Sequence, residues 1–427
     1  PANTVTTVCA GLINTMKHFF VLLLVCAAVN GNAQNISSPY SILGIGDIEN
    51  DDYGRYSASG SAAVSRRENG YYNFSNPASL TVMNYKSINL DFAFRGKTSQ
   101  FKVPGVDTLS AATKDFIVKR ITMAFKLTPT IGIAFGLKPF SSVNYQYNTI
   151  SSIADGSAQY IKYTDGSGGI YQSYFSAAKQ LNKNFSVGAT ASWLFGSLQS
   201  STEYYNSNIG LDIIKSENKF YYGAGLQAGL QYYTAAEKKW KHTIGITGSV
   251  FSNLKGQNTV EYTENSTAIK TLQAEDISFK LPLSITAGYS AKNISGLGFH
   301  VQGSYQKWPV QKLAYRNSFV NNAYGLNAGV EYSRMLKETP VESYYIGIGV
   351  KVEQSYLLVN NQRLNTYAVT FGGGKNLSRL IGVNGGFEVG RRGQFSSSQI
   401  QENYFRFSVG ITVKDFWYGT KRFGRFN

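Results

Sequence analysis

The sequence predicts an all-β protein: a closed antiparallel transmembrane β-barrel of about 14 strands with an N-terminal plug, or hatch. Three observations predict this fold. Long stretches alternate apolar and polar residues, charged residues make up only 15% of the 427 residues, and 30 Tyr, 26 Phe and 43 Gly stand against 9 Pro. A strand places successive side chains on opposite faces, so each alternating stretch has one apolar and one polar face.

The first 33 residues are expected to be removed from the mature protein. Residues 1–15 precede the first Met, and we interpret them as upstream read-through. Met16-Lys17-His18 then leads into an apolar stretch, 19–29, that is too short to span a bilayer. Small residues at Gly31 and Ala33 fit a signal-peptidase site, so the sequence predicts cleavage after Ala33 and export.

A lipoprotein is the alternative interpretation of the leader, with Leu23-Leu24-Val25-Cys26 as the lipobox. Val25 is unfavourable directly before the cysteine, and the apolar run continues beyond it, so the signal peptide is favoured. Cys9 and Cys26 are then both lost, and the mature chain has no thiol chemistry. Loss of Lys17 reduces the formal net charge from +16 to +15.

The mature chain divides into three predicted parts. Residues 34–86 begin with a stretch rich in Gly, Ser and Asn that lacks sustained periodicity, which indicates an irregular plug. Period-2 alternation begins at residue 87 and continues to residue 416, which we assign to the barrel. Residues 417–427 are a basic, aromatic C-terminal tail.

Fourteen segments carry the alternation in the barrel region. The first is typical, since Ile88, Leu90 and Phe92 alternate with polar or small residues. Many segments run about 12–22 residues, whereas strands of soluble proteins average about 5–6. The predicted strands are 87–96, 115–127, 131–150, 158–179, 185–205, 212–233, 241–262, 270–290, 297–314, 319–335, 343–358, 363–375, 380–394 and 401–416.

The connections between these segments favour one topology. Every second connection is short, and several of the others are longer or more polar, such as 97–114. Short periplasmic turns that alternate with longer external loops place both chain ends in the periplasm. Closure of the sheet pairs the first strand with the last, because an unpaired backbone group in hydrocarbon costs several kcal/mol.

Residues that carry catalytic or metal chemistry are sparse. The mature chain has two histidines, His242 and His300, and neither belongs to a metal-binding or catalytic motif. Gly372–Asn376 lacks the spacing of a phosphate loop. Glu49 with Asp51-Asp52 suggests calcium, but a solvated acidic loop is the favoured interpretation. We therefore expect no enzymatic activity, no cofactor and no metal.

Charged residues at inward positions are expected to face a wet or plugged lumen and to pair across strands. The candidates are Arg120, Lys126, Lys280, Glu331, Lys351, Glu388 and Arg406. The positive net charge is explained most simply by lysines and arginines that contact lipid phosphates, with outer-membrane lipid or lipopolysaccharide as the partner. No basic stripe interleaves with aromatics, so nucleic acid is not an expected partner.

A short motif resembles a known family. The runs Gly60–Val64 and Asn73–Leu80, with the turn Asn76-Pro77-Ala78, resemble the N-terminal hatch of the FadL family. The resemblance implies a fourteen-stranded outer-membrane barrel that transports long-chain fatty acids or aromatic hydrocarbons. Ser38–Ser41 followed by Gly44–Asp47 is similar to FadL-like barrels of Bacteroidota. The tail beyond residue 416 departs from the family's pattern of ending on a strand-terminal aromatic.

The leading functional interpretation is an outer-membrane channel or transporter for small hydrophobic molecules, gated by rearrangement of the plug. The alternative is a structural or accessory barrel subunit of a larger outer-membrane complex, in secretion or assembly. The C-terminal tail is a candidate contact with such a partner, although a frayed terminus is the favoured interpretation of it. A plain porin is the third interpretation.

Overall fold

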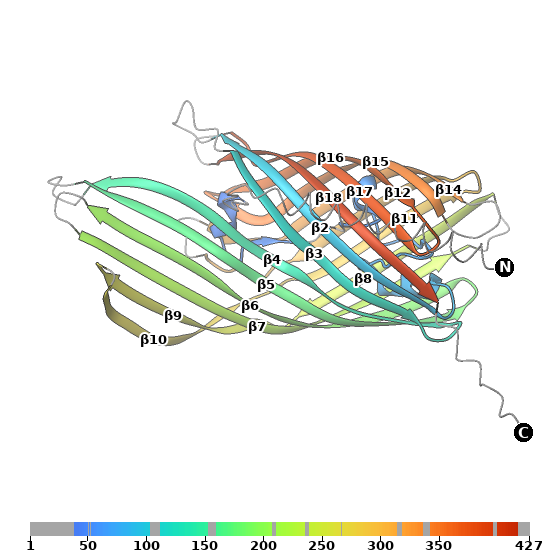
Figure 1. Ribbon diagram of the computed structural model, residues 1–427, viewed down its shortest axis with the longest axis horizontal. Coiled ribbons are helices and arrows are strands. Elements are labelled where there is room, and N and C mark those ends of the chain that lie inside the picture. Colours follow the sequence, from blue (N-terminus) through green and yellow to red (C-terminus); the bar gives the residue numbers. More distant parts are fainter. Residues whose placement is uncertain are drawn as a thin grey trace, which may run out of the picture. The chain divides into compact units, whose positions relative to one another are not determined.

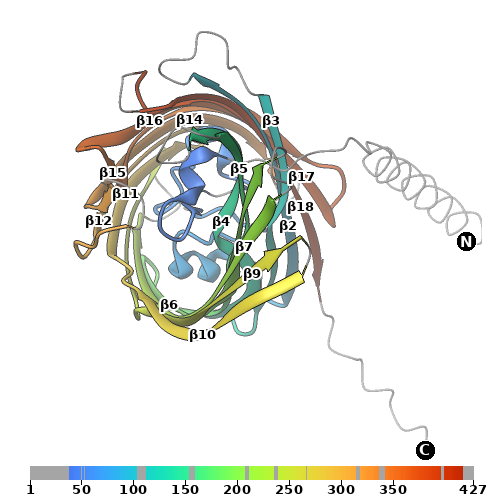
Figure 2. The ribbon, with the colours of Figure 1, turned by 90° about the vertical axis from the view of Figure 1, so that its left-hand side faces the viewer.

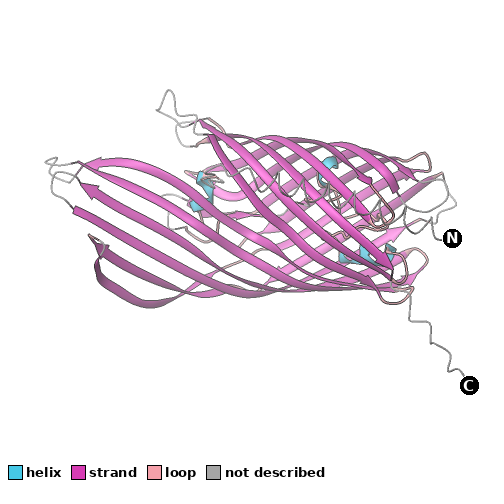
Figure 3. Cartoon of the chain, viewed as in Figure 1, coloured by secondary structure: helices cyan, strands magenta, loops and turns pink. Residues whose placement is uncertain are grey.

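The computed structural model describes residues 38–49, 51, 53–102, 112–152, 159–206, 211–234, 239–265, 267–313, 318–335, 342–395 and 399–416. Strand is the dominant secondary structure in these ranges (Figure 3). Among these residues, no helix has the length and apolar character needed to cross a membrane. The predicted signal peptide, both cysteines and the tail at 417–427 lie outside the described residues.

The wall is a closed antiparallel barrel with fourteen strand positions. Closure is made by β18 and β2, which pair residue by residue from Gln401↔Lys102 to Phe416↔Ser87. Two wall positions are each built from two strands in line, β8 with β9 and β10 with β11. The wall strands are β2 (Ser87–Lys102), β3 (Ala112–Lys126), β4 (Ile131–Ser152), β5 (Gln159–Asn182), β6 (Phe185–Asn206), β7 (Leu211–Tyr233), β8 (Trp240–Phe251), β9 (Leu254–Glu264), β10 (Thr267–Phe279), β11 (Leu283–Asn293), β12 (Leu297–Lys307), β14 (Ala323–Met335), β15 (Glu342–Val359), β16 (Gln362–Asn376), β17 (Ile381–Arg392) and β18 (Gln401–Phe416).

The alternation of apolar with polar or small residues along each strand gives the barrel an apolar outer face and a different inner face. On β15, the side chains of Ile346, Ile348 and Val350 are 59%, 57% and 50% exposed, and they point outward. Gly349, between Ile348 and Val350, and the buried Lys351, directly after Val350, face the lumen. Similar exposed apolar residues occur on the strands all round the wall, which gives the barrel the outer surface that hydrocarbon requires.

The structure refines three of the predicted strands. The segments 241–262 and 270–290 are each interrupted, at residues 252–253 and 280–282. The segment 297–314 ends at Lys307, and a short strand, β13 (Ser318–Val320), precedes β14. Pro282 and Pro309 fall in these interruptions, where the missing backbone N–H of proline cannot contribute to a ladder.

The wall is taller on one side than on the other (Figure 1). Strands β4 to β7 have 22 to 24 residues, whereas β12, β14 and β17 have 11 to 13. The antiparallel pair of β9 and β10 lies next to β7 on the tall side (Figure 1).

The described residues of 38–86, which we call the N-terminal segment, lie inside the barrel (Figure 2). The segment contains three short 3-10 helices and one two-residue strand: η1 (Pro39–Ile42), β1 (Asp47–Ile48), η2 (Ser57–Ser59) and η3 (Pro77–Val82). β1 pairs with β4, while η2 contacts β14 to β17 and η3 contacts β3 to β7. The segment therefore contacts two separate parts of the wall, β3 to β7 and β14 to β17.

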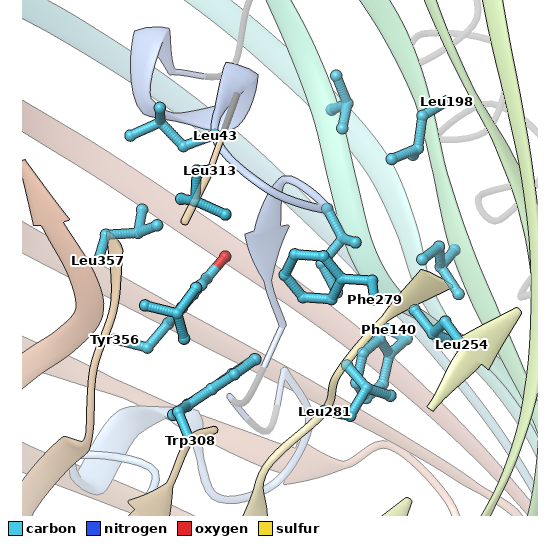
Figure 4. Close-up of a cluster of buried hydrophobic side chains, with 14 of the residues drawn as sticks. Leu43, Phe140, Leu198, Leu254, Phe279, Leu281, Trp308, Leu313, Tyr356 and Leu357 are labelled. Atoms are coloured by element: carbon cyan, nitrogen blue, oxygen red, sulfur yellow. The ribbon is translucent and has the colours of Figure 1, made fainter. Parts of the chain in front are cut away.

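A large cluster of buried apolar side chains joins the N-terminal segment to the wall (Figure 4). Leu43 and Ile45 of the N-terminal segment pack there against Phe279, Trp308 and Tyr356 of the wall and its loops. Gly44 has a φ of +65°, and a Cβ at this position would lie 3.3 Å from the Phe279 ring. Glycine thus allows the segment to pass close to the ring.

Candidate functional site: the filled lumen

The Asn-Pro-Ala turn begins η3 and is buried against the wall. The side chain of Asn76 accepts a hydrogen bond from the Ala78 N–H (3.0 Å), which caps the helix. Its Nδ2 donates to the carbonyls of Val64 (2.9 Å) and Leu230 (3.0 Å). One side chain therefore joins the turn, the rest of the N-terminal segment and strand β7.

Two wall glycines give this turn its space. A Cβ on Gly188 of β6 would lie 2.6 Å from the backbone nitrogen of Ala78. A Cβ on Gly229 of β7 would lie 2.2 Å from the Oδ1 of Asn76. Both distances are shorter than any ordinary contact, so the fit between the turn and the wall requires glycine at these positions.

Arg55 is the centre of the first buried ion-pair cluster. Its guanidinium donates to both carboxylate oxygens of Glu331 (2.7 and 2.6 Å) and of Glu342 (2.9 and 2.7 Å). Arg66 pairs with Glu331 and with Glu68, both at 2.8 Å. We call these five residues the Arg55 cluster; two arginines and one glutamate come from the N-terminal segment and two glutamates from the wall.

A second buried cluster surrounds Glu49 and Asp51. Glu49 pairs with Lys119 and with Arg95 (3.4 Å) of the wall. Asp51 pairs with Lys351 (2.5 Å) and Arg406 (2.6 Å). We call these six residues the Glu49–Asp51 cluster; here the N-terminal segment supplies the anions and the wall supplies the cations.

Three carboxylates of the N-terminal segment, Glu49, Asp51 and Glu68, are held in their charged form. Burial alone would raise the pKa of Glu49, but Lys119 and Arg95 hold that pKa well below its usual range. Burial likewise opposes ionisation of Asp51, yet Lys351 and Arg406 lower its pKa. The pKa of Glu68 is also well below its usual range, because Lys292 and Arg66 outweigh the effect of burial.

A cavity of about 300 Å³ remains in the lumen. Charged groups line it from both the N-terminal segment and the wall, and polar side chains from several further strands complete the lining. The charged members that matter for its chemistry are Glu49, Asp51, Lys97, Lys138, Arg392 and Arg406. This interior suits water and ions better than an apolar molecule.

Most of the lumen-facing candidates take part in these contacts. Glu331 belongs to the Arg55 cluster, and Lys351 and Arg406 belong to the Glu49–Asp51 cluster. Glu388 pairs with both of these cations, at 3.5 and 3.3 Å. The structure therefore brings these four candidates into contact with each other or with the N-terminal segment.

The other three candidates lie apart from one another. Arg120 is buried and pairs with Asp91 of β2. Lys126 is buried and donates to the backbone carbonyl of Thr81 (2.6 Å) in η3. Lys280 is exposed in the interruption between β10 and β11, where its backbone N–H and carbonyl both bond the side-chain amide of Gln311.

Sequence reasoning missed the charges of the N-terminal segment itself. Arg55, Arg66 and Glu68 were not among the candidate residues, although each pairs inside the lumen. A signal was present, because these charges interrupt a stretch of small and aromatic residues that otherwise has the composition of a buried core. Glu49 and Asp51, weighed for calcium, instead contact lysines and arginines, and Asp52 lies outside the described residues.

Comparison with solved structures gives the fold family. A Pseudomonas aeruginosa FadL homologue superimposes with a TM-score of 0.58 at 10% identity, covering 86% of this chain and 99% of that one. The Pseudomonas putida toluene transporter TodX gives a TM-score of 0.57 at 15% identity, with 86% and 100% covered. The Ralstonia pickettii toluene transporter TbuX gives 0.57 at 12% identity, with 86% and 99% covered. The predicted FadL-like barrel fold is confirmed.

Comparison with sequence families is more specific. No curated protein matches the sequence. The model of the BamG family matches residues 15–424, which include the whole barrel and the N-terminal segment. This chain therefore belongs to the BamG family.

Proposed function

We propose that this chain is an integral outer-membrane barrel whose lumen is permanently filled, and that it acts as an accessory subunit of a larger outer-membrane complex. One observation carries the proposal: two buried clusters of ion pairs hold the N-terminal segment. In the Arg55 cluster the arginines of the segment pair with wall glutamates, and in the Glu49–Asp51 cluster the carboxylates of the segment pair with wall lysines and arginines. Removing one partner of a buried pair costs about 3–5 kcal/mol, so displacing the segment in every transport cycle is expensive.

The remaining cavity supports the same proposal. A hydrophobic solute that entered it would displace water from Glu49, Asp51, Lys97 and Arg406 without replacing the lost hydrogen bonds. A barrel with this interior serves better as a rigid body that presents its outer surface and extracellular rim to partners. Catalysis is not part of the proposal.

The experiment is extraction in a mild detergent, followed by affinity purification of the full chain from its native membrane. A partner protein in stable stoichiometry supports the accessory role. A barrel that is recovered alone in several mild detergents contradicts it.

A second candidate function is a channel for small hydrophobic molecules. The large apolar cluster favours it, because Phe279, Trp308 and Tyr356 offer an apolar surface that Leu43 and Ile45 occupy. Withdrawal of η1 would expose this surface, and structures of similar fold include hydrocarbon channels. Uptake of labelled toluene and oleate by cells with and without the gene tests this function, and equal uptake contradicts it.

A further inference from the structure

Strand β10 is paired along one edge only among the described residues. Its ladder runs with β9, from Thr267↔Glu264 to Phe279↔Leu254. Strand β11, which continues β10 in the wall, pairs on its two edges with β8 and β12. β12 ends at Lys307 and therefore does not extend beside β10. No described strand lies along the second edge of β10 (Figures 1 and 2).

The chain that follows β12 leaves the wall. Trp308 is 3% exposed, and its ring stacks on that of Tyr356 inside the barrel, with centroids 4.4 Å apart. Leu313 then donates its backbone N–H to the carbonyl of Ser318 (2.9 Å), which places residues 311–313 beside β13. β13 pairs in turn with β15, so residues 311–313 are joined through β13 to the β15 side of the wall.

Among the described residues, Gln311 hydrogen-bonds the β10 side of the wall. The side-chain amide of Gln311 accepts a hydrogen bond from the N–H of Lys280 and donates to its carbonyl, both at 3.2 Å. Lys280 directly follows the last residue of β10. Gln311 therefore hydrogen-bonds the backbone N–H and carbonyl at the end of the unpaired edge. Beyond this point, no strand among the described residues pairs with this edge of β10.

This edge stands in water rather than in hydrocarbon. Leu283 and Ile285 of β11 are 47% and 49% exposed and belong to the apolar outer surface. On β10, by contrast, the exposed residues between Glu275 and Phe279 are Glu275, Asp276 and Ser278, and the exposed apolar Ile269 and Leu272 lie nearer the turn to β9. Unpaired backbone groups are too costly within a bilayer, but in water they remain available to another strand.

Two irregularities limit where a strand can be added. The register between β10 and β9 shifts between Ala268 and Lys270, and again between Leu272 and Glu275. Bulges of this kind protect a free edge against unspecific pairing. The regular part is Glu275–Phe279, where each residue has a direct partner on β9.

The charge of the hairpin indicates the chemistry of the added strand. Residues 254–279 contain four carboxylates and two lysines, a net charge of −2, in a chain whose net charge is +16. Two of the carboxylates, Glu275 and Asp276, lie in the regular part of the edge. A complementary segment is therefore extended and basic.

We infer that the edge of β10 at Glu275–Phe279 receives one strand from a partner protein, a short, extended and basic segment that continues the sheet. Main-chain hydrogen bonds supply the affinity, and the acidic pair selects the basic sequence. The inference rests on the proposed function, because it names the surface on which the proposed accessory subunit holds its partner.

The test uses a photo-cross-linking amino acid in the full chain in intact cells. It is introduced at Asp276 or Ser278 on β10 and, as a matched control, at Gln257, which lies directly opposite Asp276 on the fully paired β9. We expect Asp276 and Ser278 positions to capture residues two apart in one basic segment, as a strand requires. Equal capture from Gln257, capture of lipopolysaccharide or a second copy of this chain, or capture without a two-residue period overturns the inference.

A second pair of variants tests the selection by charge. Asp276 lies in the regular part of the β10 edge, whereas Glu261 lies on β9, which is paired on both of its edges. We expect Asp276→Lys to reduce recovery of the partner about five-fold, while Glu261→Lys leaves it unchanged. Heat-modifiable migration in electrophoresis establishes that both variants are folded. Equal recovery with both variants overturns the inference.

The two proposals fail in different ways. If a partner co-purifies with the chain but the β10 positions do not capture it, the inference is wrong and the accessory role stands. If no partner co-purifies with the wild-type chain, both are wrong.

Discussion

Arg55 in the N-terminal segment and Glu331 on β14 are separated by 276 residues in the sequence and joined by two parallel hydrogen bonds, of 2.7 and 2.6 Å. Both side chains are 1% exposed. A guanidinium and a carboxylate matched in this way are strongly bonded and geometrically specific. The pair fixes the position of the segment relative to the wall.

Replacement of Arg55 by alanine is expected to destabilise the folded barrel by about 3–5 kcal/mol, because Glu331 and Glu342 lose a buried cation. Arg55→Lys keeps the charge but not the two-pronged geometry, and an intermediate loss is expected. The free energy of unfolding in urea, measured in lipid vesicles by tryptophan fluorescence, gives the comparison. A change of less than about 0.5 kcal/mol for the alanine variant would contradict the role of the pair.

Gly188→Ala is expected to displace the Asn-Pro-Ala turn, since the added Cβ would meet the backbone at Ala78. Gly303→Ala is the matched control, because a Cβ at Gly303 meets no atom within 4 Å. Limited trypsin digestion at Arg66 and Arg67 reports the displacement. Cleavage should increase in the first variant and stay at the wild-type level in the control; similar cleavage in both would show that the turn does not need the space at Gly188.

Acidification is expected to release the N-terminal segment. The pKa values of Glu49, Asp51 and Glu68 are lower in the folded protein than in an unfolded chain. The stabilisation from their charged forms is therefore complete above the unfolded values, about 4, and is lost as the pH falls through the folded values. A nitroxide on Ser75→Cys, next to the lumen cavity, should stay immobile from about pH 8 to pH 5 and become mobile below about pH 4. Mobility that rises between about pH 6 and pH 8 would point to a different titrating group.

The strands of the barrel were predictable because one face of each meets lipid. Residues 401–416 were predicted as a strand and form β18, since alternation there runs without interruption. The end of β12 was not predicted: residues 308–314 continue the mixed apolar and polar pattern, but Trp308 is buried by a tertiary contact with Tyr356. Local periodicity does not report which solvent or neighbour a side chain finally meets.

The contacts of the lumen were predictable only in part. Inward charges such as Glu331 and Lys351 were found because their strands have a regular period. Their partners Arg55 and Asp51 lie in a segment without periodicity, about 280–300 residues away. The local sequence does not specify such pairs, because they form only when the N-terminal segment lies inside the closed barrel.

We propose that the N-terminal segment stays in the lumen while the protein works. Ser65 of the segment and Ser290 of β11 have hydroxyl oxygens 2.6 Å apart, and the predicted mature chain has no cysteine. A disulfide between Ser65→Cys and Ser290→Cys would fix the segment to the wall, with each single variant as a control. We predict that cells carrying the disulfide-bonded double variant grow and retain the partner complex as the wild type does. Loss of function that is restored by a reducing agent would contradict the claim, because the segment would then have to move.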